Sequence, residues 1–168
     1  CQALDRAQGW ESPKLREEAL TALARLTDYH VLDEFQVDRR HSYAWCRGAT
    51  HNIAMTMTRG IFGAATLMPD HPHAEQWRQW AEETFRRSFN QPSPEDASNY
   101  ESDWFHSILT MIDLLGKGED AYCLPHHRAC FEHLKEMITP SGAVVGYGDS
   151  GDRGNAAILP VLEKGAAV

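Results

Sequence analysis

Residues 93–116 read SPEDASNYESDWFHSILTMIDLLG, and in them a polar, proline-bearing segment runs directly into an apolar one. The apolar side chains recur at three- and four-residue spacing, which is the pattern of a helix face packed on a neighbour. They are Ile108, Met111, Ile112 and Leu115. Gly116 is typical of the residue that follows a helix. We therefore predict a helix over 98–115, with acids, a phenol, an imidazole and an indole gathered at its start.

Similar periodicity predicts further helices on both sides of this one. The predicted ranges are 12–35, 50–68, 73–89, 126–138 and 155–163. Ser12 and Thr50 are candidate N-caps of the first two, and Pro13 suits the first helical position. Residues 140–154, PSGAVVGYGDSGDRG, interrupt the helical pattern with five glycines. We expect an all-α single domain, 1–168, made of antiparallel helical hairpins with one Gly-rich irregular loop.

The composition fits one globular domain and narrows its partners. Of the 168 residues, 42% are hydrophobic and 24% are charged, which are ordinary values for a folded domain. The net charge of -8 argues against nucleic acids and anionic membranes as partners. No apolar run is long enough for a membrane span. We expect a periplasmic or extracellular protein, with Cys1 as a candidate lipid anchor. The alternative is a truncated chain, in which the first residue is Cys by chance.

A cationic and aromatic segment precedes the second predicted helix. Residues 36–50 read QVDRRHSYAWCRGAT and place Arg40 and Arg47 close to Trp45 in the sequence. Guanidinium groups match carboxylates and flat rings stack on sugar faces, so this segment is a candidate wall of an acidic-sugar site. The alternative is a solvated loop whose arginines pair with neighbouring acids.

Histidine and cysteine spacing predicts no metal site. His71 and His73 lie in a turn between two predicted helices, and no third ligand is near them in the sequence, so we expect surface residues. The run GYGDSG lacks the residue order of a phosphate-binding loop, and we expect no cofactor. Cys123 and Cys130 are consistent either with a disulfide or with two free thiols.

Three segments resemble the catalytic domains of α/α-toroid polysaccharide lyases. Residues 51–83, HNIAMTMTRGIFGAATLMPDHPHAEQWRQWAEE, resemble one of their helical hairpins, with an Asn at a helix start and a "PDHP" turn. Residues 95–116 resemble the next hairpin, and TPSGAVVGYGDSG, residues 139–151, is similar to a loop of heparinase-like and alginate-lyase-like toroids. The resemblance covers about residues 40–154 and implies a portion of a larger toroid that acts on an acidic polysaccharide.

A polysaccharide lyase removes the proton beside a uronic acid carboxylate and expels the 4-linked sugar. The reaction needs a cation or amide at the carboxylate, a base for the proton and an acid for the leaving oxygen. Asn52 and His51 suit the first task, and Tyr100 or His106 suits the other two. The residues assigned to catalysis are Tyr100, His51, Asn52 and His106, and those assigned to substrate binding are Arg40, Trp45, Arg47, Trp104 and Tyr147.

Helix geometry constrains these assignments and leaves two other functions open. Tyr100 and Trp104 are four residues apart and share a helix face. Tyr100 and His106 can point into one cleft only if the helix begins after Tyr100. A glycoside hydrolase would instead use two carboxylates, from Glu95, Asp96, Asp103 and Asp149. A noncatalytic domain that binds glycan or protein would align aromatic side chains on an open surface.

Overall fold

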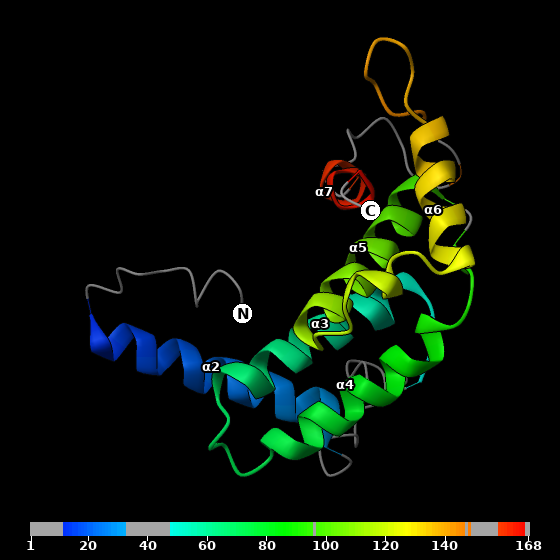
Figure 1. Cartoon of the computed structure of the whole chain (residues 1–168). Coiled ribbons are helices and arrows are strands. Elements are labelled where there is room, and N and C mark those ends of the chain that lie inside the picture. The colour runs from blue at the N-terminus through cyan, green and yellow to red at the C-terminus, as the bar shows by residue number, and fades with distance from the viewer. Residues whose placement is uncertain (1–11, 33–47, 96, 147, 149–157, 167–168) are drawn as a thin grey trace.

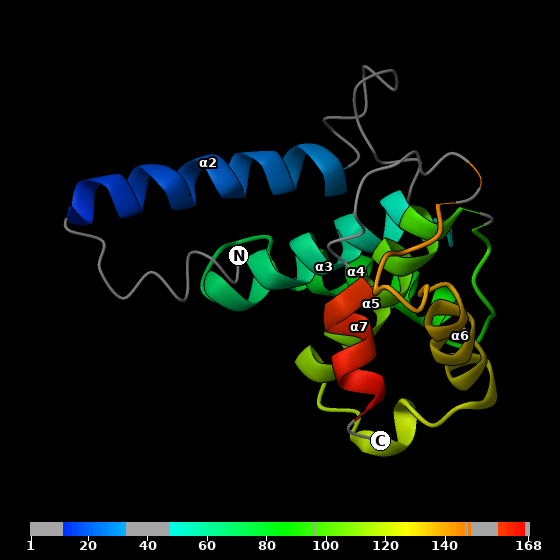
Figure 2. The same ribbon diagram turned by 90° about the horizontal axis from the view of Figure 1, so that it is seen from above.

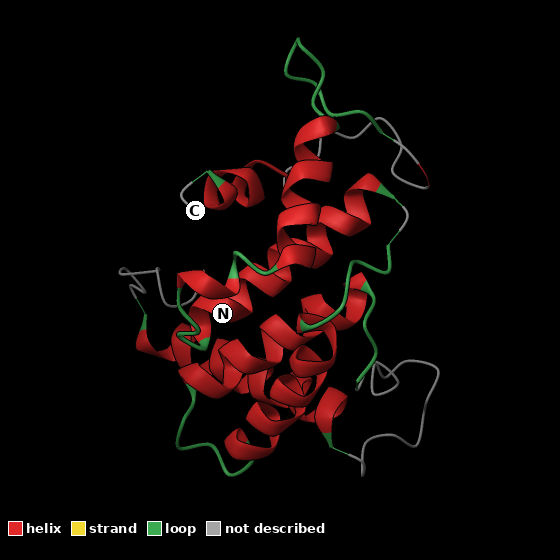
Figure 3. Ribbon diagram, turned by 45° about the vertical axis from the view of Figure 1, so that its right-hand side comes forward, coloured by secondary structure: helices red, strands yellow, loops and turns green. Residues whose placement is uncertain are grey.

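The described part of the chain is helical. The computed structural model describes residues 12–32, 48–95, 97–146, 148 and 158–166. Its elements are α2 (Pro13–Val31), α3 (Asn52–Leu67), α4 (Ala74–Phe89), α5 (Ser98–Leu114), the 3-10 helix η3 (Glu119–Ala121), α6 (Pro125–Glu136) and α7 (Ile158–Gly165). Figure 3 shows helices and loops and no strand among these residues. The predicted all-α class is therefore confirmed.

The packing of these helices is centred on α3. It makes its most extensive contacts with α4 and α5 and also touches α2. Ala54, Ala64 and Ala65 have no exposed surface, and such small side chains allow neighbouring helices to approach closely. In Figure 1, α4 returns antiparallel to α3, and α5 runs in the same direction as α3. Alternating directions of this kind suit helical hairpins, and their closure into a toroid stays a prediction.

The outer helices cover two sides of this arrangement. α2 lies alongside α3 and α4, as the view from above shows (Figure 2). α7 contacts both α5 and α6. None of the described helices combines the length and the apolar character that a membrane crossing needs.

Several helix boundaries agree with the predictions and others do not. Ser12 caps α2 as predicted, since its Oγ accepts a hydrogen bond of 3.4 Å from the Leu15 N–H. The helix ends at Val31, short of the predicted limit at residue 35. The predicted N-cap Thr50 is wrong, because the cap of α3 is His51, whose Nδ1 accepts from the Ala54 N–H at 3.3 Å.

The Gly-rich segment is described only in part. The Thr139 N–H donates to the Ala143 carbonyl at 2.8 Å, and a single antiparallel bridge joins Ile138 to Val144. Gly142 has a φ of 81° in the turn between them, a conformation that favours glycine. Residues 147 and 149–154 lie outside the described residues.

A buried imidazole joins α6 to the core. His127 has no exposed surface, and its Nδ1 donates to the Ala121 carbonyl at 2.7 Å. The rings of Phe89 and Phe105 lie 5.3 and 5.6 Å from its ring centroid. Burial lowers the pKa of His127, because the charged ring would lose its hydration. The folded protein therefore holds this histidine neutral.

The two described cysteines are free thiols. Cys123 is half-buried, and Cys130 is buried. Burial, helped by the charge of Glu101, raises the pKa of the Cys130 thiol to about 11. A thiol with such a pKa stays protonated at neutral pH and is a poor nucleophile. Of the two alternatives for this pair, the structure therefore has the free thiols.

The burial of His127 predicts an acid-sensitive fold. The unfolded chain protonates this ring near its ordinary pKa of about 6.5, whereas the folded protein resists protonation. The unfolded state thus binds more protons, so the free energy of unfolding is highest above about pH 6.5 and falls as the pH drops below that value. Urea unfolding at several pH values measures this decline. We expect H127Q to reduce it, by about 1.4 kcal/mol for each tenfold difference in proton affinity.

The neighbouring substitution H126Q is the comparison, because it removes a half-buried imidazole from the same turn. His126 Nε2 hydrogen-bonds the Phe89 carbonyl at 2.8 Å, so this variant also tests the loss of a ring contact to α4. A decline with pH that is the same in H127Q as in the unsubstituted protein would contradict the assignment.

Candidate functional site

The starts of α3 and α5 are joined by two hydrogen bonds. The indole Nε1 of Trp104 donates to the Thr50 carbonyl at 2.7 Å. The backbone N–H of Asn52 donates to Glu95 Oε1 at 2.5 Å. Both bonds connect the chain just before α3 to the chain at the start of α5. The two N-terminal ends consequently lie at the same end of the helix pair.

Glu95 supplies a negative charge to the first turn of α3. Its carboxylate accepts a helix N-terminal N–H, where the backbone dipoles favour an anion. The Glu95 N–H in turn donates to Ser93 Oγ at 3.2 Å, which orients the loop before α5. The first turn of α3 therefore already has the Glu95 carboxylate as its partner. A substrate carboxylate would have to bind a positively charged group elsewhere.

Three of the four predicted catalytic residues lie at this end of the helix pair. His51 is the N-cap of α3, Asn52 is its first residue, and Tyr100 is in the first turn of α5. All three are half-buried. The predicted substrate-binding residues Arg40, Trp45, Arg47 and Tyr147 lie outside the described residues, as do Asp96 and Asp149.

Trp104 is a packing residue rather than the predicted sugar platform. It has no exposed surface, and its ring stacks on Phe105 with centroids 6.2 Å apart. A sugar can stack only on an aromatic face that solvent reaches, so this prediction was wrong. The shared face of Tyr100 and Trp104 points the indole into the core, where its N–H finds the Thr50 carbonyl.

His106 lies on a different side of α5 from Tyr100. The helix begins at Ser98, so both residues belong to it. Six residues at 100° each place Tyr100 and His106 about 120° apart around the axis. The condition under which both would point into one cleft, a helix start after Tyr100, is not met.

Two charged residues, Arg59 and Asp103, lie near enough to His106 for their charges to shift its pKa. Arg59 of α3 is half-buried, Asp103 is at the surface one turn before His106, and His106 itself is half-buried. The Nδ1 atom of His106 is buried and has no hydrogen-bond partner among the described residues. We call these three residues the Arg59 cluster.

Electrostatics in the Arg59 cluster favour a neutral histidine beside a cation. Burial lowers the pKa of His106, and the Arg59 and Lys164 charges lower it further, against the opposing effect of Asp103 and Asp113. Partial burial raises the pKa of Asp103, while Arg59 and His106 lower it. Burial also lowers the pKa of Arg59, and the charge of Asp103 opposes this by raising it. The guanidinium nevertheless stays charged at any physiological pH. The cluster thus offers one fixed cation and one imidazole free to take a proton.

Sequence reasoning missed Arg59 because only the apolar stripe of its helix was assigned a role. Arg59 follows Asn52 by seven residues, which is two helical turns, so both lie on nearly the same face of α3. That spacing was a usable signal. Its approach to Asp103 and His106 depends on how α5 packs against α3, which no local pattern reports.

Comparisons of the chain with protein-family models, curated proteins and solved structures found no match.

The Trp104 bond predicts a measurable stability contribution at this site. We expect W104F to lower the free energy of unfolding by about 1–3 kcal/mol, because the Thr50 carbonyl loses its donor while most of the ring volume remains. W80F makes the same exchange at a buried indole of α4 and controls for the loss of ring size. Urea unfolding of both variants measures the difference. Equal effects in the two would mean that the bond contributes nothing specific.

Proposed function

We propose that the chain is part of a polysaccharide lyase that cleaves a uronic-acid-containing polysaccharide by β-elimination, with the Arg59 cluster as its reacting centre. The observation that carries the proposal is a charged guanidinium close enough to a half-buried histidine to lower its pKa. Elimination beside a carboxylate needs this pair of groups, a cation for the acid and a base for the adjacent proton. The resemblance of residues 51–83 and 95–116 to lyase hairpins supports the same chemistry.

Arg59 is the proposed partner of the uronate carboxylate. A guanidinium binds a carboxylate through two parallel hydrogen bonds and stabilises the negative charge that grows on it when the neighbouring carbon loses a proton. Partial burial strengthens that interaction relative to water. Asn52, two turns earlier on the same helix, is the proposed second contact through its side-chain amide.

His106 is the proposed base, and its protonated ring is the proposed acid, because Tyr100 lies about 120° away around α5 and does not share its cleft. The neutral imidazole takes the proton from the carbon that bears the carboxylate. The electrons of that C–H bond form a double bond to the neighbouring carbon, whose bond to the bridging oxygen breaks. The leaving oxygen receives the proton back from the His106 ring. Atoms and charges balance with these groups alone, and His51 is a further proposed polar contact at the start of α3.

Hydrolysis is the second candidate, favoured by one observation. Partial burial raises the pKa of Asp103, as a general acid requires, and Glu95, which accepts a hydrogen bond from the Asn52 N–H, is a second candidate carboxylate. The two reactions differ in their products, because only elimination creates a carbon–carbon double bond conjugated to the carboxylate. A noncatalytic glycan-binding role would yield neither product.

A product assay distinguishes the three. The purified protein is incubated with polymers of mannuronate, guluronate, glucuronate and iduronate, and ultraviolet absorbance and reducing ends are followed together. We expect both signals to rise in step for at least one polymer. Reducing ends without absorbance would favour hydrolysis, and neither signal with any polymer would overturn the enzyme proposal.

Substitutions in the Arg59 cluster test the assigned roles. We expect H106Q to lower kcat by about 10²–10⁴-fold, the usual contribution of a positioned base. R59Q should lower it by about 10²–10³-fold, the usual effect of removing one donor to developing negative charge. R86Q, an exposed arginine of α4, is the matched control and should leave kcat unchanged. Circular dichroism and thermal unfolding establish that each variant is folded.

The pH profile separates a base from a structural histidine. Because burial and Arg59 lower the pKa of His106, we expect kcat/KM to persist below pH 6.5 and to fall only when this ring becomes protonated. Y100F tests the other assignment made from the sequence, in which Tyr100 carries the proton transfer at the start of α5. Loss of turnover in a folded Y100F protein, with full turnover in H106Q, would move the reacting centre there, and a folded, fully active H106Q protein would remove His106 from the mechanism.

A further inference from the structure

We propose that Asp28, His71 and His73 form a binding site for a divalent transition metal, with Zn²⁺ as the fitting ion. One candidate ligand atom from each of the three residues lies within 4.8 Å of the other two. They come from two distant parts of the chain, since Asp28 is in the last turns of α2 and the histidines are in the turn between α3 and α4. Asp28 precedes His71 by 43 residues, so the lack of a third ligand near the histidines in the sequence did not exclude one in space.

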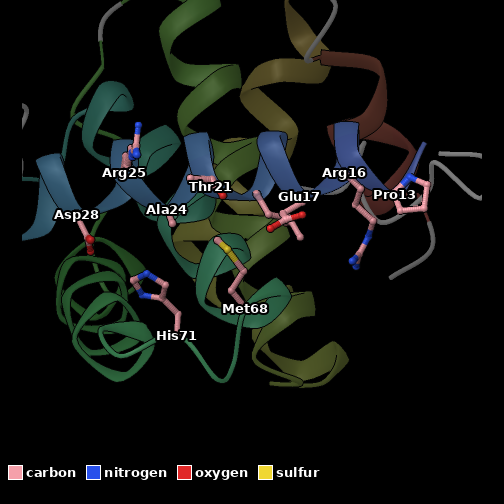
Figure 4. A pocket seen from close by; sticks show the side chains of 10 residues that line it. Pro13, Arg16, Glu17, Thr21, Ala24, Arg25, Asp28, Met68 and His71 are labelled. Carbon is pink, nitrogen blue, oxygen red and sulfur yellow. The ribbon is translucent and has the colours of Figure 1, made fainter. Parts of the chain in front are cut away.

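The contacts among the three residues already converge on one point. His73 Nδ1 lies 2.9 Å from Asp28 Oδ1. The carboxylate is only 16% exposed and the His73 side chain 36% exposed, so the pair is shielded from bulk water but remains reachable. Figure 4 shows the Asp28 carboxylate and the His71 ring facing each other. Ligand atoms of a tetrahedral zinc lie about 3.3–3.6 Å apart, a spacing that small side-chain rotations can reach from here.

Trp77 holds two of the three ligands in place. Its indole Nε1 donates to Asp28 Oδ1 at 2.9 Å, and its ring stacks on His71 with centroids 4.3 Å apart and planes at 22°. Trp77 has no exposed surface, so it is itself a rigid support. Hydrogen bonds and packing behind the ligands are typical of metal sites, because they fix the orientation of the ligand side chains before the ion binds.

The ligand set favours zinc among the common ions. Two imidazoles and one carboxylate are the donors that Zn²⁺ takes in sites with an open fourth position, whereas Ca²⁺ and Mg²⁺ prefer oxygen ligands alone. Cu²⁺ and Ni²⁺ fit imidazole donors as well. Co²⁺ is a useful spectroscopic substitute for Zn²⁺, because its visible absorption reports the coordination.

A cleft adjoins the proposed site, and the fourth coordination position of the metal would face it. It has a volume of about 500 Å³ and runs between α2 and the turn after α3, with Asp28 and His71 at one end (Figure 4). Arg16 and Arg25 also line it. The fourth ligand there would be a water molecule or an anionic oxygen of a small ligand.

Direct metal binding tests the proposal. The protein is freed of metal with a chelator and titrated with ZnCl₂ by calorimetry. We expect saturable binding of one ion and a rise in the unfolding temperature, because the ion binds the folded state. Co²⁺ should give visible absorption bands of a four-coordinate site. An absence of saturable Zn²⁺ binding would overturn the proposal and leave an ordinary His–Asp ion pair.

Three variants locate the ion. H71A leaves the Asp28–His73 contact intact, and D28N retains an oxygen that can accept from Trp77, so both should fold. Each should weaken Zn²⁺ binding by at least about tenfold. H133A removes a half-exposed histidine of α6 and should leave the affinity unchanged. Unchanged affinity in H71A and D28N, or a loss only in H133A, would place the ion elsewhere and overturn the assignment.

Discussion

The close approach of α5 to α3 is the constraint on which the described structure depends. Two hydrogen bonds fix it at one end, from Trp104 to the Thr50 carbonyl and from the Asn52 N–H to Glu95. Along the rest of the interface, the small side chains of α3 allow α4 and α5 to pack on two of its sides. If this approach were lost, Arg59 would have no reason to lie near Asp103 and His106, and the proposed reacting centre would not exist.

The Arg59 cluster shows how a polar group survives in an otherwise apolar interface. α5 buries eleven of its residues, and a guanidinium placed beside it without a partner would be costly. Asp103 at the surface supplies the compensating charge, as its effect on the pKa of Arg59 indicates. The position of this cation near a histidine whose pKa is lowered by burial is the basis of the proposed chemical role.

The helices were predictable from sequence, and the contacts between them were not. The spacing of Ile108, Met111 and Ile112 identified α5, and Ser12 with Pro13 identified the start of α2. The cap of α3 was misplaced by one residue, because both Thr50 and His51 have a side chain able to accept the capping bond. Trp104 was misassigned for a physical reason, since an indole can serve a sugar or a core equally well and only its neighbours decide.

The two proposed sites lie near different parts of α3, and this separates what each would do. The helix has 16 residues and is therefore about 24 Å long. Asn52 is at its start and Arg59 is two turns further on, whereas His71 and His73 follow its end. A metal held by Asp28 and the two histidines would tie α2 to the turn after α3 without touching the Arg59 cluster. Its effect should accordingly appear in the stability of the α2 contact, while the charge on Arg59 and the protonation of His106 remain set by α5.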